Sequence, residues 1–189
     1  MTVTHLTPED YATSCWSGGT TTELLIRPHG AVYGQRDFLC RISSATVELE
    51  ESTFTALPDY DRLIATLEGT ITLVHDDGEP LVLAPYQVHA FDGGSHTVSL
   101  GRCRDFNLML RKGRATGSLR PLLVTDPVSC PLSPAAQTAL LYCAKGACTV
   151  QGVALATGEG LLLEDLAANA LHLRGEPFAR LMLAEVSYL

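Results

Sequence analysis

The sequence predicts an all-β protein of the barrel or sandwich type, on three grounds. Many short apolar and β-branched segments follow one another at close spacing, with turn residues between them. Two segments of the first half recur in the same order in the second half, which indicates a duplicated β unit. Apolar residues make up 46% and charged residues 18% of the 189 residues, a balance that supports a buried core.

In the first half, turn residues separate a series of strand-like segments. Thr7 followed by Pro8 is typical of a capped helix start, so we expect a short helix there. Turns are expected at Gly69, at residues 76–78 and at residues 91–94. The expected strands cover residues 20–26, 38–49 with a bulge near 43–45, 63–67, 70–74, 81–83, 98–100 and 106–110.

The second half repeats part of this pattern. Residues 67–73 resemble residues 144–150, and residues 106–110 resemble residues 178–183. Ser133 also begins a stretch that is typical of a capped helix, but the duplication favours a strand from Ala139 onward. Residues 118–133 are rich in proline and lack periodicity, which predicts a linker. We therefore expect an N-terminal β unit at 1–117, a linker at 118–133 and a smaller β unit at 134–189.

Charge and hydrophobicity restrict the classes of partner. The net charge is −8, and an acidic surface repels phosphate backbones, so nucleic acid is not expected as a partner. No run of about 18 apolar residues occurs, so no membrane span is expected. The first 16 residues lack a basic start followed by an apolar run, which predicts a cytoplasmic protein. None of the six cysteines forms a CxxC pair, so they are expected to be buried or free thiols rather than zinc ligands.

Six segments within residues 16–111 together resemble the HutD/Ves family. They are WSGGTTTE at 16–23, FLCRIS at 38–43, FTALPDYDR at 54–62, LEG at 67–69, FDG at 91–93 and DFNLM at 105–109. The resemblance implies a bicupin, that is, two fused cupin-type β-barrels, and a link to histidine utilisation or to stress induction. It implies no reaction. The chain departs from the family in a shorter glycine run after Trp16 and in Cys40, where an aromatic residue often precedes Arg41.

The resemblance to cupins also predicts that no metal cofactor is bound. Metal-binding cupins place a His-x-His and a glutamate before a turn glycine, and a further histidine later. With Gly69 as that glycine, these positions fall on Ala56, Pro58 and Arg62, none of which ligates a metal. The later position falls near His89, and one imidazole alone makes a poor site.

Arg62 is the principal candidate for ligand binding. Strand alternation places Arg62, Ile64 and Thr66 on one face, and a guanidinium inside a barrel needs an anion. Asp105 and Asn107 likewise share one face of another strand. Two alternatives follow: an internal salt bridge between Arg62 and Asp105, or a bound carboxylate that all three residues orient.

Three further residues are candidates for the same pocket. Phe91 is expected as an apolar wall. Arg41 reaches either the pocket or a surface carboxylate, and Trp16 either closes the barrel mouth or fills the core, with the core favoured. In the second half Ala139 falls where Arg62 lies in the first, which predicts a structural barrel filled by Leu and Val.

The favoured function is a metal-free bicupin that binds a small carboxylate as a sensor or modulator, without a cofactor and without catalysis. The alternative is a metal-independent isomerase or hydrolase that uses Asp105 or Glu68 as acid or base. A third hypothesis is a metal enzyme with His75, His89 and His96 as ligands.

Overall fold

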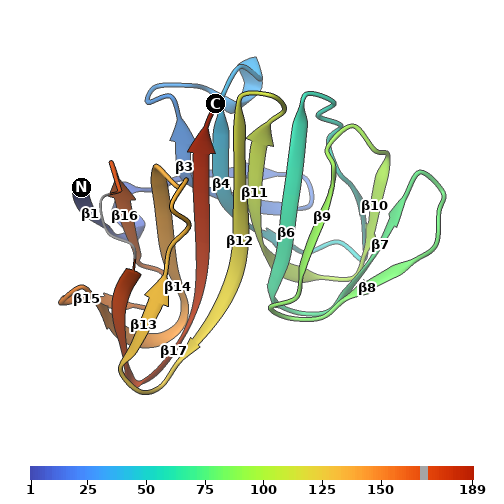
Figure 1. Ribbon diagram of the computed structural model, residues 1–189. Helices are drawn as coiled ribbons and strands as arrows, with labels where there is room; N and C mark the ends of the chain where they lie inside the picture. Colours follow the sequence, from blue (N-terminus) through green and yellow to red (C-terminus); the bar gives the residue numbers. More distant parts are fainter. Residues whose placement is uncertain (167–169) are drawn as a thin grey trace. The chain divides into compact units, whose positions relative to one another are not determined.

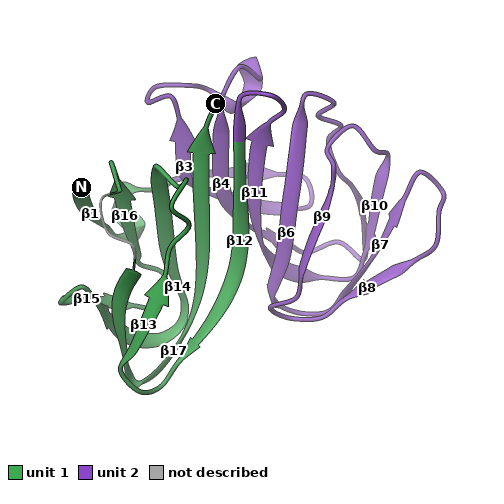
Figure 2. Ribbon diagram, viewed as in Figure 1, with its two compact units in different colours: residues 1–11, 116–189 green, residues 12–115 purple. Residues whose placement is uncertain are grey.

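The computed structural model describes residues 1–166 and 170–189, which form β-strands and two short 3-10 helices (Figure 1). These residues divide into two compact units (Figure 2). We call residues 12–115 the central unit, and residues 1–11 with 116–189 the split unit. The prediction of an all-β protein is confirmed. No helix among the described residues is long and apolar enough to cross a membrane.

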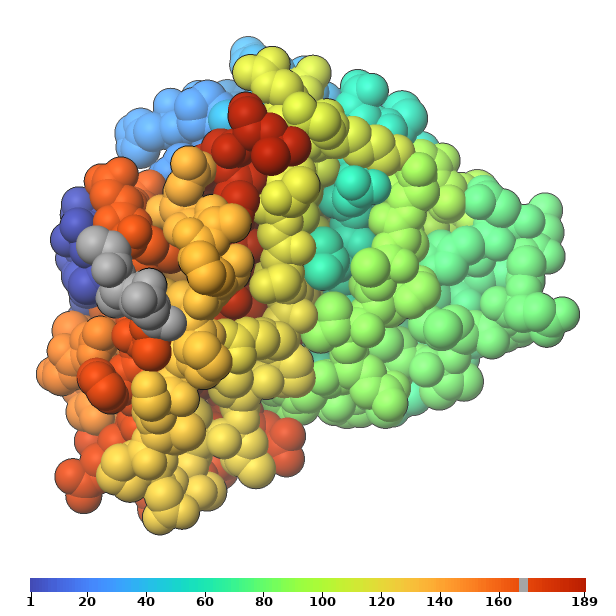
Figure 3. Space-filling model, in the orientation of Figure 1, coloured from blue at the N-terminus to red at the C-terminus, as the bar shows by residue number. Residues whose placement is uncertain are grey.

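The central unit consists of two antiparallel sheets. Six strands form one in the order β2-β3-β4-β11-β6-β9, and four form the other in the order β5-β10-β7-β8. The bounds are β2 Ala12–Trp16, β3 Gly19–Arg27, β4 Cys40–Val47, β5 Glu51–Thr53, β6 Tyr60–Glu68, β7 Ile71–His75, β8 Leu81–Leu83, β9 Val88–Asp92, β10 Thr97–Leu100 and β11 Cys103–Arg111. All seven strands expected in this part of the sequence are present. The exposed β7–β8 turn, residues 76–80, forms the right-hand edge of this unit in Figures 1 and 3.

The bulge expected near residues 43–45 lies on the neighbouring strands instead. The register of β3 against β4 shifts between Glu23 and Leu25, and that of β11 against β6 shifts between Arg104 and Asp105. The strand β4 itself is continuous. The irregularities in pairing lie where β3 pairs with β4 and where β11 pairs with β6.

Strand alternation holds as predicted in β6 and β11. Arg62, Ile64 and Thr66 are buried on one face of β6, and Asp105 and Asn107 are buried on the same face of the sheet. The interior beside them is apolar and includes Ile64, Ile71, Leu73 and Leu83, with Phe54 and Phe91 packed against it. A polar strip therefore lies next to an aliphatic core on one sheet face.

The split unit has a seven-stranded sheet in the order β1-β16-β14-β17-β12, with β13 on β17 and β15 on β14. The bounds are β1 Thr2–Leu6, β12 Ala115–Val124, β13 Val128–Pro131, β14 Thr138–Val150, β15 Val153–Ala156, β16 Gly160–Glu164 and β17 Ala170–Tyr188. The preference for strand over helix from Ala139 onward is confirmed by β14. The short helix expected after Thr7 is a 3-10 turn, Pro8–Asp10.

Two features of the split unit differ from the sequence prediction. Residues 118–133, expected as a linker, form most of β12 and all of β13, and among the described strands both pair with β17 alone. Proline is tolerated on such edge strands because its missing N–H breaks no ladder on the outer side. Residues 2–6 pair with β16 and so belong to this unit, whereas the sequence division assigned them to the first half.

The turn glycines Gly69 and Gly146 are equivalent in the two units. Both have positive φ, +79° and +84°, and a Cβ there would lie 2.4 Å and 2.2 Å from the carbonyl oxygens of Arg102 and Phe178. The two glycines therefore share the same backbone conformation and the same close approach to a carbonyl oxygen, in agreement with their alignment in the sequence. The sequence alignment of Phe178 with Phe106 is wrong. The carbonyl of Phe178 lies against Gly146 in the same way as the carbonyl of Arg102 lies against Gly69, so Phe178 corresponds to Arg102.

The residues of the two units can be matched by counting back from these glycines and then across the registers of β6 with β11 and of β14 with β17. Arg62 corresponds to Ala139, and Asn107 corresponds to Leu183. Ala139 and Leu183 are fully buried in a Leu-rich core, as the sequence predicted for this half. None of the three sheets closes on itself through hydrogen bonds among the described residues.

Candidate functional site

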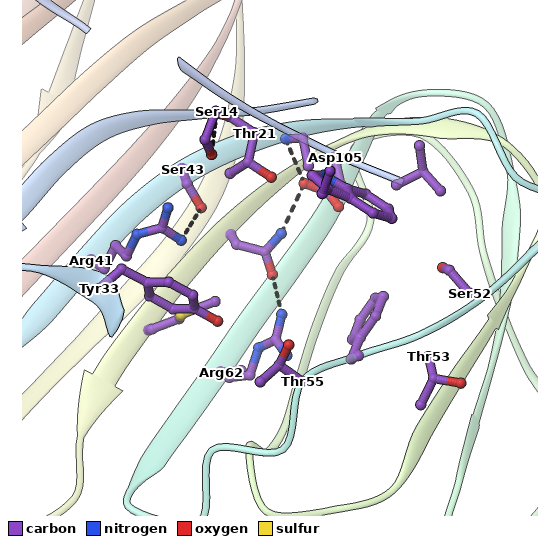
Figure 4. Close-up of a pocket in the computed structure, with 16 residues that line it drawn as sticks. Ser14, Thr21, Tyr33, Arg41, Ser43, Ser52, Thr53, Thr55, Arg62 and Asp105 are labelled. Carbon is purple, nitrogen blue, oxygen red and sulfur yellow. Dashed lines mark hydrogen bonds between the residues drawn. The ribbon is translucent and has the colours of Figure 1, made fainter. Parts of the chain in front are cut away.

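A cavity of about 340 Å³ opens inside the central unit, a size within the range of small-molecule sites (Figure 4). Strands β2, β3, β4, β6 and β11 and residues 52–55 form its walls. Two guanidinium groups, Arg41 and Arg62, reach it together with Asp105 and Asn107. Five of the six site residues expected from the sequence therefore line this cavity, the fifth being Trp16, and only Phe91 lies outside its lining.

Arg62 is buried, with 6% of its surface exposed, and its hydrogen bonding is incomplete. Its Nη2 donates to Asn107 Oδ1 at 3.1 Å, whereas its Nε has no hydrogen-bond partner among the described residues. The guanidinium carbon lies 4.8 Å from the ring centroid of Phe54 and 5.1 Å from that of Phe91. Burial lowers the pKa of Arg62 and the charge of Asp105 opposes this, but an arginine stays protonated in proteins. The site thus holds a buried cation with a donor to spare.

Asp105 is placed by the break in the ladder between β4 and β11. There the Ala45 N–H donates to Asp105 Oδ1 at 3.0 Å instead of to a backbone carbonyl. The same oxygen accepts from Asn107 Nδ2 at 2.8 Å. Burial raises the pKa of Asp105 to about 6, although the Ala45 N–H and the Arg62 charge act in the opposite direction.

Asn107 connects Asp105 to Arg62. Because its Nδ2 faces Asp105, its Oδ1 faces Arg62, and both ends of the amide are engaged. The direct salt bridge between Arg62 and Asp105, one of the two alternatives from the sequence, is not formed. Asp105 instead orients Asn107, and Asn107 holds one end of the guanidinium.

Arg41 was expected to reach either the pocket or a carboxylate, and it does both: it lines the cavity and also pairs with a carboxylate. Its Nε donates to Glu23 Oε2 at 2.6 Å, and its Nη1 donates to Ser43 Oγ at 3.2 Å. Its guanidinium carbon lies 4.3 Å from the centroid of the Tyr33 ring. Sequence reasoning missed Glu23, Ser43 and Tyr33, although the first two lie within segments that carry the family resemblance. The Glu23 partner leaves Arg41 less available to an anion than Arg62.

Trp16 lines the cavity, whereas Phe91 does not. Trp16 lines the cavity with 41% of its surface exposed, so its favoured position in the core was wrong. Its ring lies over Gly18, where an added Cβ would be 2.1 Å from Trp16 Cζ3. Phe91 is not a wall of the cavity; it stacks behind the guanidinium of Arg62.

The sequence profile of the HutD family matches residues 8–181. The chain belongs to the HutD family. A search of curated proteins found no match. Among solved structures, a conserved protein of unknown function from Pseudomonas aeruginosa PAO1, PA5104, is 28% identical with a TM-score of 0.84, over 99% of this chain and 100% of that one. HutD from Pseudomonas fluorescens SBW25, in a structure described as a formate condition, is 27% identical with a TM-score of 0.82, over 100% of both chains.

More distant likenesses show the fold alone. A cupin 2 conserved barrel domain protein from Leptotrichia buccalis is 13% identical with a TM-score of 0.58, over 92% of this chain and 91% of that one, so the fold is cupin-like. The bacterial pirin YhhW from Escherichia coli, in complex with nickel(II), is 11% identical with a TM-score of 0.71, over 97% of this chain and 98% of that one.

In this HutD-family chain the histidines and Glu68 do not form a metal or catalytic centre with the cavity. His75 and His89 are in contact, whereas His96 is exposed. Among the described residues, no three His, Cys, Asp or Glu side chains come together as metal ligands. The Glu68 side chain is 73% exposed and pairs with Arg104, so it does not serve the cavity as acid or base. Five of the six cysteines are buried and Cys15 is exposed.

Proposed function

We propose that this HutD-family protein is a cytoplasmic, metal-free bicupin whose first barrel binds a small carboxylate at Arg62. In this proposal the central unit is the ligand-binding barrel and the split unit is a second barrel of structural role. Binding would make the protein a sensor or modulator in histidine utilisation or a stress response. The observation that carries the proposal is the buried Nε of Arg62, which has no hydrogen-bond partner in the described part of the chain and lies beside a cavity of about 340 Å³.

The energetics favour an anion at this place. A buried donor without a partner costs about 1–3 kcal/mol, and more when the group is charged. A carboxylate accepts two parallel hydrogen bonds from one guanidinium, which gives both charge compensation and a fixed orientation. Arg62 is the better anchor of the two arginines because Arg41 already donates to Glu23.

The aromatic residues support a small organic acid rather than a bare inorganic anion. Trp16 and Phe54 line the cavity, and Phe91 stacks on the guanidinium from behind. Such rings exclude water, and this strengthens a charge-assisted hydrogen bond to Arg62. An apolar body attached to the carboxylate would bury its surface against Trp16 and Phe54.

Trp16 provides the test, because it is the only tryptophan of the chain and lies at the cavity. Formate, acetate and larger carboxylates are titrated while Trp16 fluorescence is followed, with calorimetry as an independent measurement. Arg62→Ala should weaken binding about 10- to 100-fold, the equivalent of one charge-assisted contact. Arg62→Lys should restore binding only in part, since an ammonium lacks the planar pair of donors.

The matched control is Arg102→Ala. Arg102 is an exposed cation of the same unit that pairs with Glu50, so its removal changes the net charge equally without touching the cavity. Equal loss of affinity in Arg62→Ala and Arg102→Ala would show that binding depends on overall charge and not on this site. Failure of every carboxylate to bind the wild type would refute the proposal.

A second candidate, a metal-independent isomerase or hydrolase, is supported by Asp105 alone. Its pKa of about 6 lies close to the range in which a carboxyl group exchanges protons at neutral pH, and the residue lines the cavity. Turnover assays on any carboxylate that binds, with Asp105→Asn as the inactive comparison, distinguish this candidate from a binding protein.

A further inference from the structure

His75 and His89 form a contact that joins the two sheets of the central unit. His75 ends β7 of the four-stranded sheet, and His89 lies in β9 at the edge of the six-stranded sheet. Their Nε2 atoms are 2.9 Å apart, and both rings are half-buried. A neutral imidazole carries one N–H, so one ring donates to the other across this distance. Neither ring lines the carboxylate cavity.

The neighbouring hydroxyl favours one ring as the donor. The Thr97 hydroxyl donates to the Ser95 carbonyl at 3.3 Å, and its oxygen lies 2.8 Å from His75 Nδ1. With its proton directed at Ser95, Thr97 accepts from His75 Nδ1–H, and we assign His75 Nε2 as the acceptor of the imidazole contact on this basis. It follows that His89 Nε2–H donates to His75, and that His89 Nδ1 carries the free lone pair.

This arrangement accepts a first proton more readily than a second one. A proton added at His89 Nδ1 leaves all of these hydrogen bonds in place and turns the imidazole contact into a charge-assisted one. A second proton would place an N–H of His75 against an N–H of His89 at 2.9 Å, so the contact would have to open. The pair therefore titrates as a unit in two separate steps.

Phe91 connects the pair to the guanidinium of the cavity. The Phe91 ring centroid lies 4.8 Å from that of His75 and 5.7 Å from that of His89, and 5.1 Å from the Arg62 guanidinium carbon. Burial is the main cause that lowers the pKa of both imidazoles, and Arg62 lowers that of His75 further.

The other charged groups around the pair are few. Asp76 follows His75 and favours its charged form. Asp92 of β9 lies on the opposite strand face and binds Lys112. The neighbouring interior positions of β8 and β10, Leu83 and Ser99, are uncharged. Arg62 is thus the cation that a proton on the pair has to face.

We propose that His75 and His89 bind one proton as a pair, and that this proton strengthens carboxylate binding at Arg62. The inference rests on the carboxylate site proposed above. A bound anion neutralises Arg62 and removes its repulsion of the protonated pair, so anion binding raises the proton affinity of the pair. By thermodynamic reciprocity, protonation of the pair raises the affinity for the anion by the same factor. For charges separated by one aromatic ring at the edge of a protein interior, we expect an effect of about three- to tenfold.

The proton site is tested first in the protein without ligand. Nitrogen chemical shifts of the imidazoles are followed by NMR against pH in the wild type, His75→Gln and His89→Gln. The wild-type pair should take up its first proton at His89 while His75 keeps Nδ1–H, and the second proton only at clearly lower pH. In His75→Gln, His89 should titrate in one step. Simultaneous titration of both rings in the wild type would overturn the inference.

The coupling is tested by calorimetric titration with formate at pH 7.5 and 5.5. Asp105→Asn serves as the common background, because Asp105 itself titrates in this range. Affinity should rise about three- to tenfold on acidification. The rise should disappear when His75→Gln and His89→Gln are added, and persist with His96→Gln, an exposed histidine outside the pair. An unchanged rise in the double histidine variant would refute the coupling. Absence of formate binding by the wild type at both pH values would overturn the carboxylate site and the coupling with it, whereas the two-step titration would stand.

Discussion

Replacing Asp105 by Asn should change how the stability of the protein depends on pH. Burial raises the pKa of Asp105 from its ordinary 3.8 to about 6 in the folded state. Its carboxyl group therefore favours folding when protonated, below about pH 3.8, and that contribution is lost as the pH rises through about 6. An asparagine carries no charge at any of these pH values, and its carbonyl oxygen can still accept from the Ala45 N–H and from Asn107.

The magnitude follows from the size of the shift. About two pKa units correspond to about 3 kcal/mol between the fully protonated and the fully ionised limits. Between pH 4.5 and pH 7.5 the expected change is about 2 kcal/mol, because part of the ionisation has already occurred at pH 4.5. The free energy of unfolding of Asp105→Asn, minus that of the wild type, should rise by this amount over the interval. The attraction between the Asp105 charge and Arg62 is already contained in the pKa of about 6. Only the exchange of a protonated carboxyl group for an amide adds an offset, and this offset is the same at all four pH values.

The assay is urea unfolding followed by circular dichroism at pH 4.5, 5.5, 6.5 and 7.5 and constant ionic strength. Asp61→Asn, which removes an exposed carboxylate from β6, controls for the change in net charge. The histidine pair, whose pKa values are lowered, destabilises both proteins in acid and cancels in the difference. A difference between variant and wild type that stays constant from pH 4.5 to 7.5 would refute the reasoning about Asp105.

Two further predictions concern the cavity mouth and the metal content. Gly18→Ala should displace the Trp16 ring, because the added Cβ would lie 2.1 Å from Trp16 Cζ3. We expect a red-shifted Trp16 fluorescence maximum and weaker carboxylate binding. An unchanged fluorescence spectrum would contradict this. The purified protein should contain no stoichiometric transition metal, since the sequence predicts Arg62 at the position of the cupin glutamate. Elemental analysis after dialysis checks this, and a near-equimolar content of zinc, iron or manganese would be evidence against it.

The sequence was sufficient for features that depend on alternation and turn chemistry. The strand β6 could be predicted with its buried face, because Arg62, Ile64 and Thr66 follow a period of two. Gly69 could be predicted as a turn, because its positive φ suits glycine. In the same way, the alignment of Gly146 with Gly69 gave Ala139 as the counterpart of Arg62.

Features that depend on distances between strands could not be derived in this way. Strand parity placed Arg62 on one face of its strand and Asp105 with Asn107 on one face of another, but only the register shows that Asn107 lies between Arg62 and Asp105. The residue that anchors Asp105, Ala45, contributes a backbone N–H, which leaves no signal in the side-chain pattern. Pro121 and Pro131 suggested a linker because a sequence does not show whether a strand lies at an edge, where proline is tolerated.

The two units together provide an internal comparison for the polar residues of the cavity. At equivalent interior positions the central unit has Arg62, Asp105 and Asn107, and the split unit has Ala139, Leu181 and Leu183. The strand geometry is therefore compatible with apolar residues, and the fold does not require the polar set. Buried polar groups that the fold does not require reduce stability, and such groups are commonly retained for function.

This comparison predicts that a combined replacement will be better tolerated than a single one. Arg62→Ala alone leaves Asn107 Oδ1 and the Asp105 charge without their cation, each at a cost of about 1–3 kcal/mol. A triple variant with Arg62→Ala, Asn107→Leu and Asp105→Asn removes both orphaned groups and keeps an acceptor for the Ala45 N–H. We expect it to be more stable than Arg62→Ala by at least about 1 kcal/mol in urea unfolding, and as unable to bind formate. If the triple variant proves less stable than the single one, then the polar set is part of the packing of the fold, and its presence is no longer an argument for a ligand.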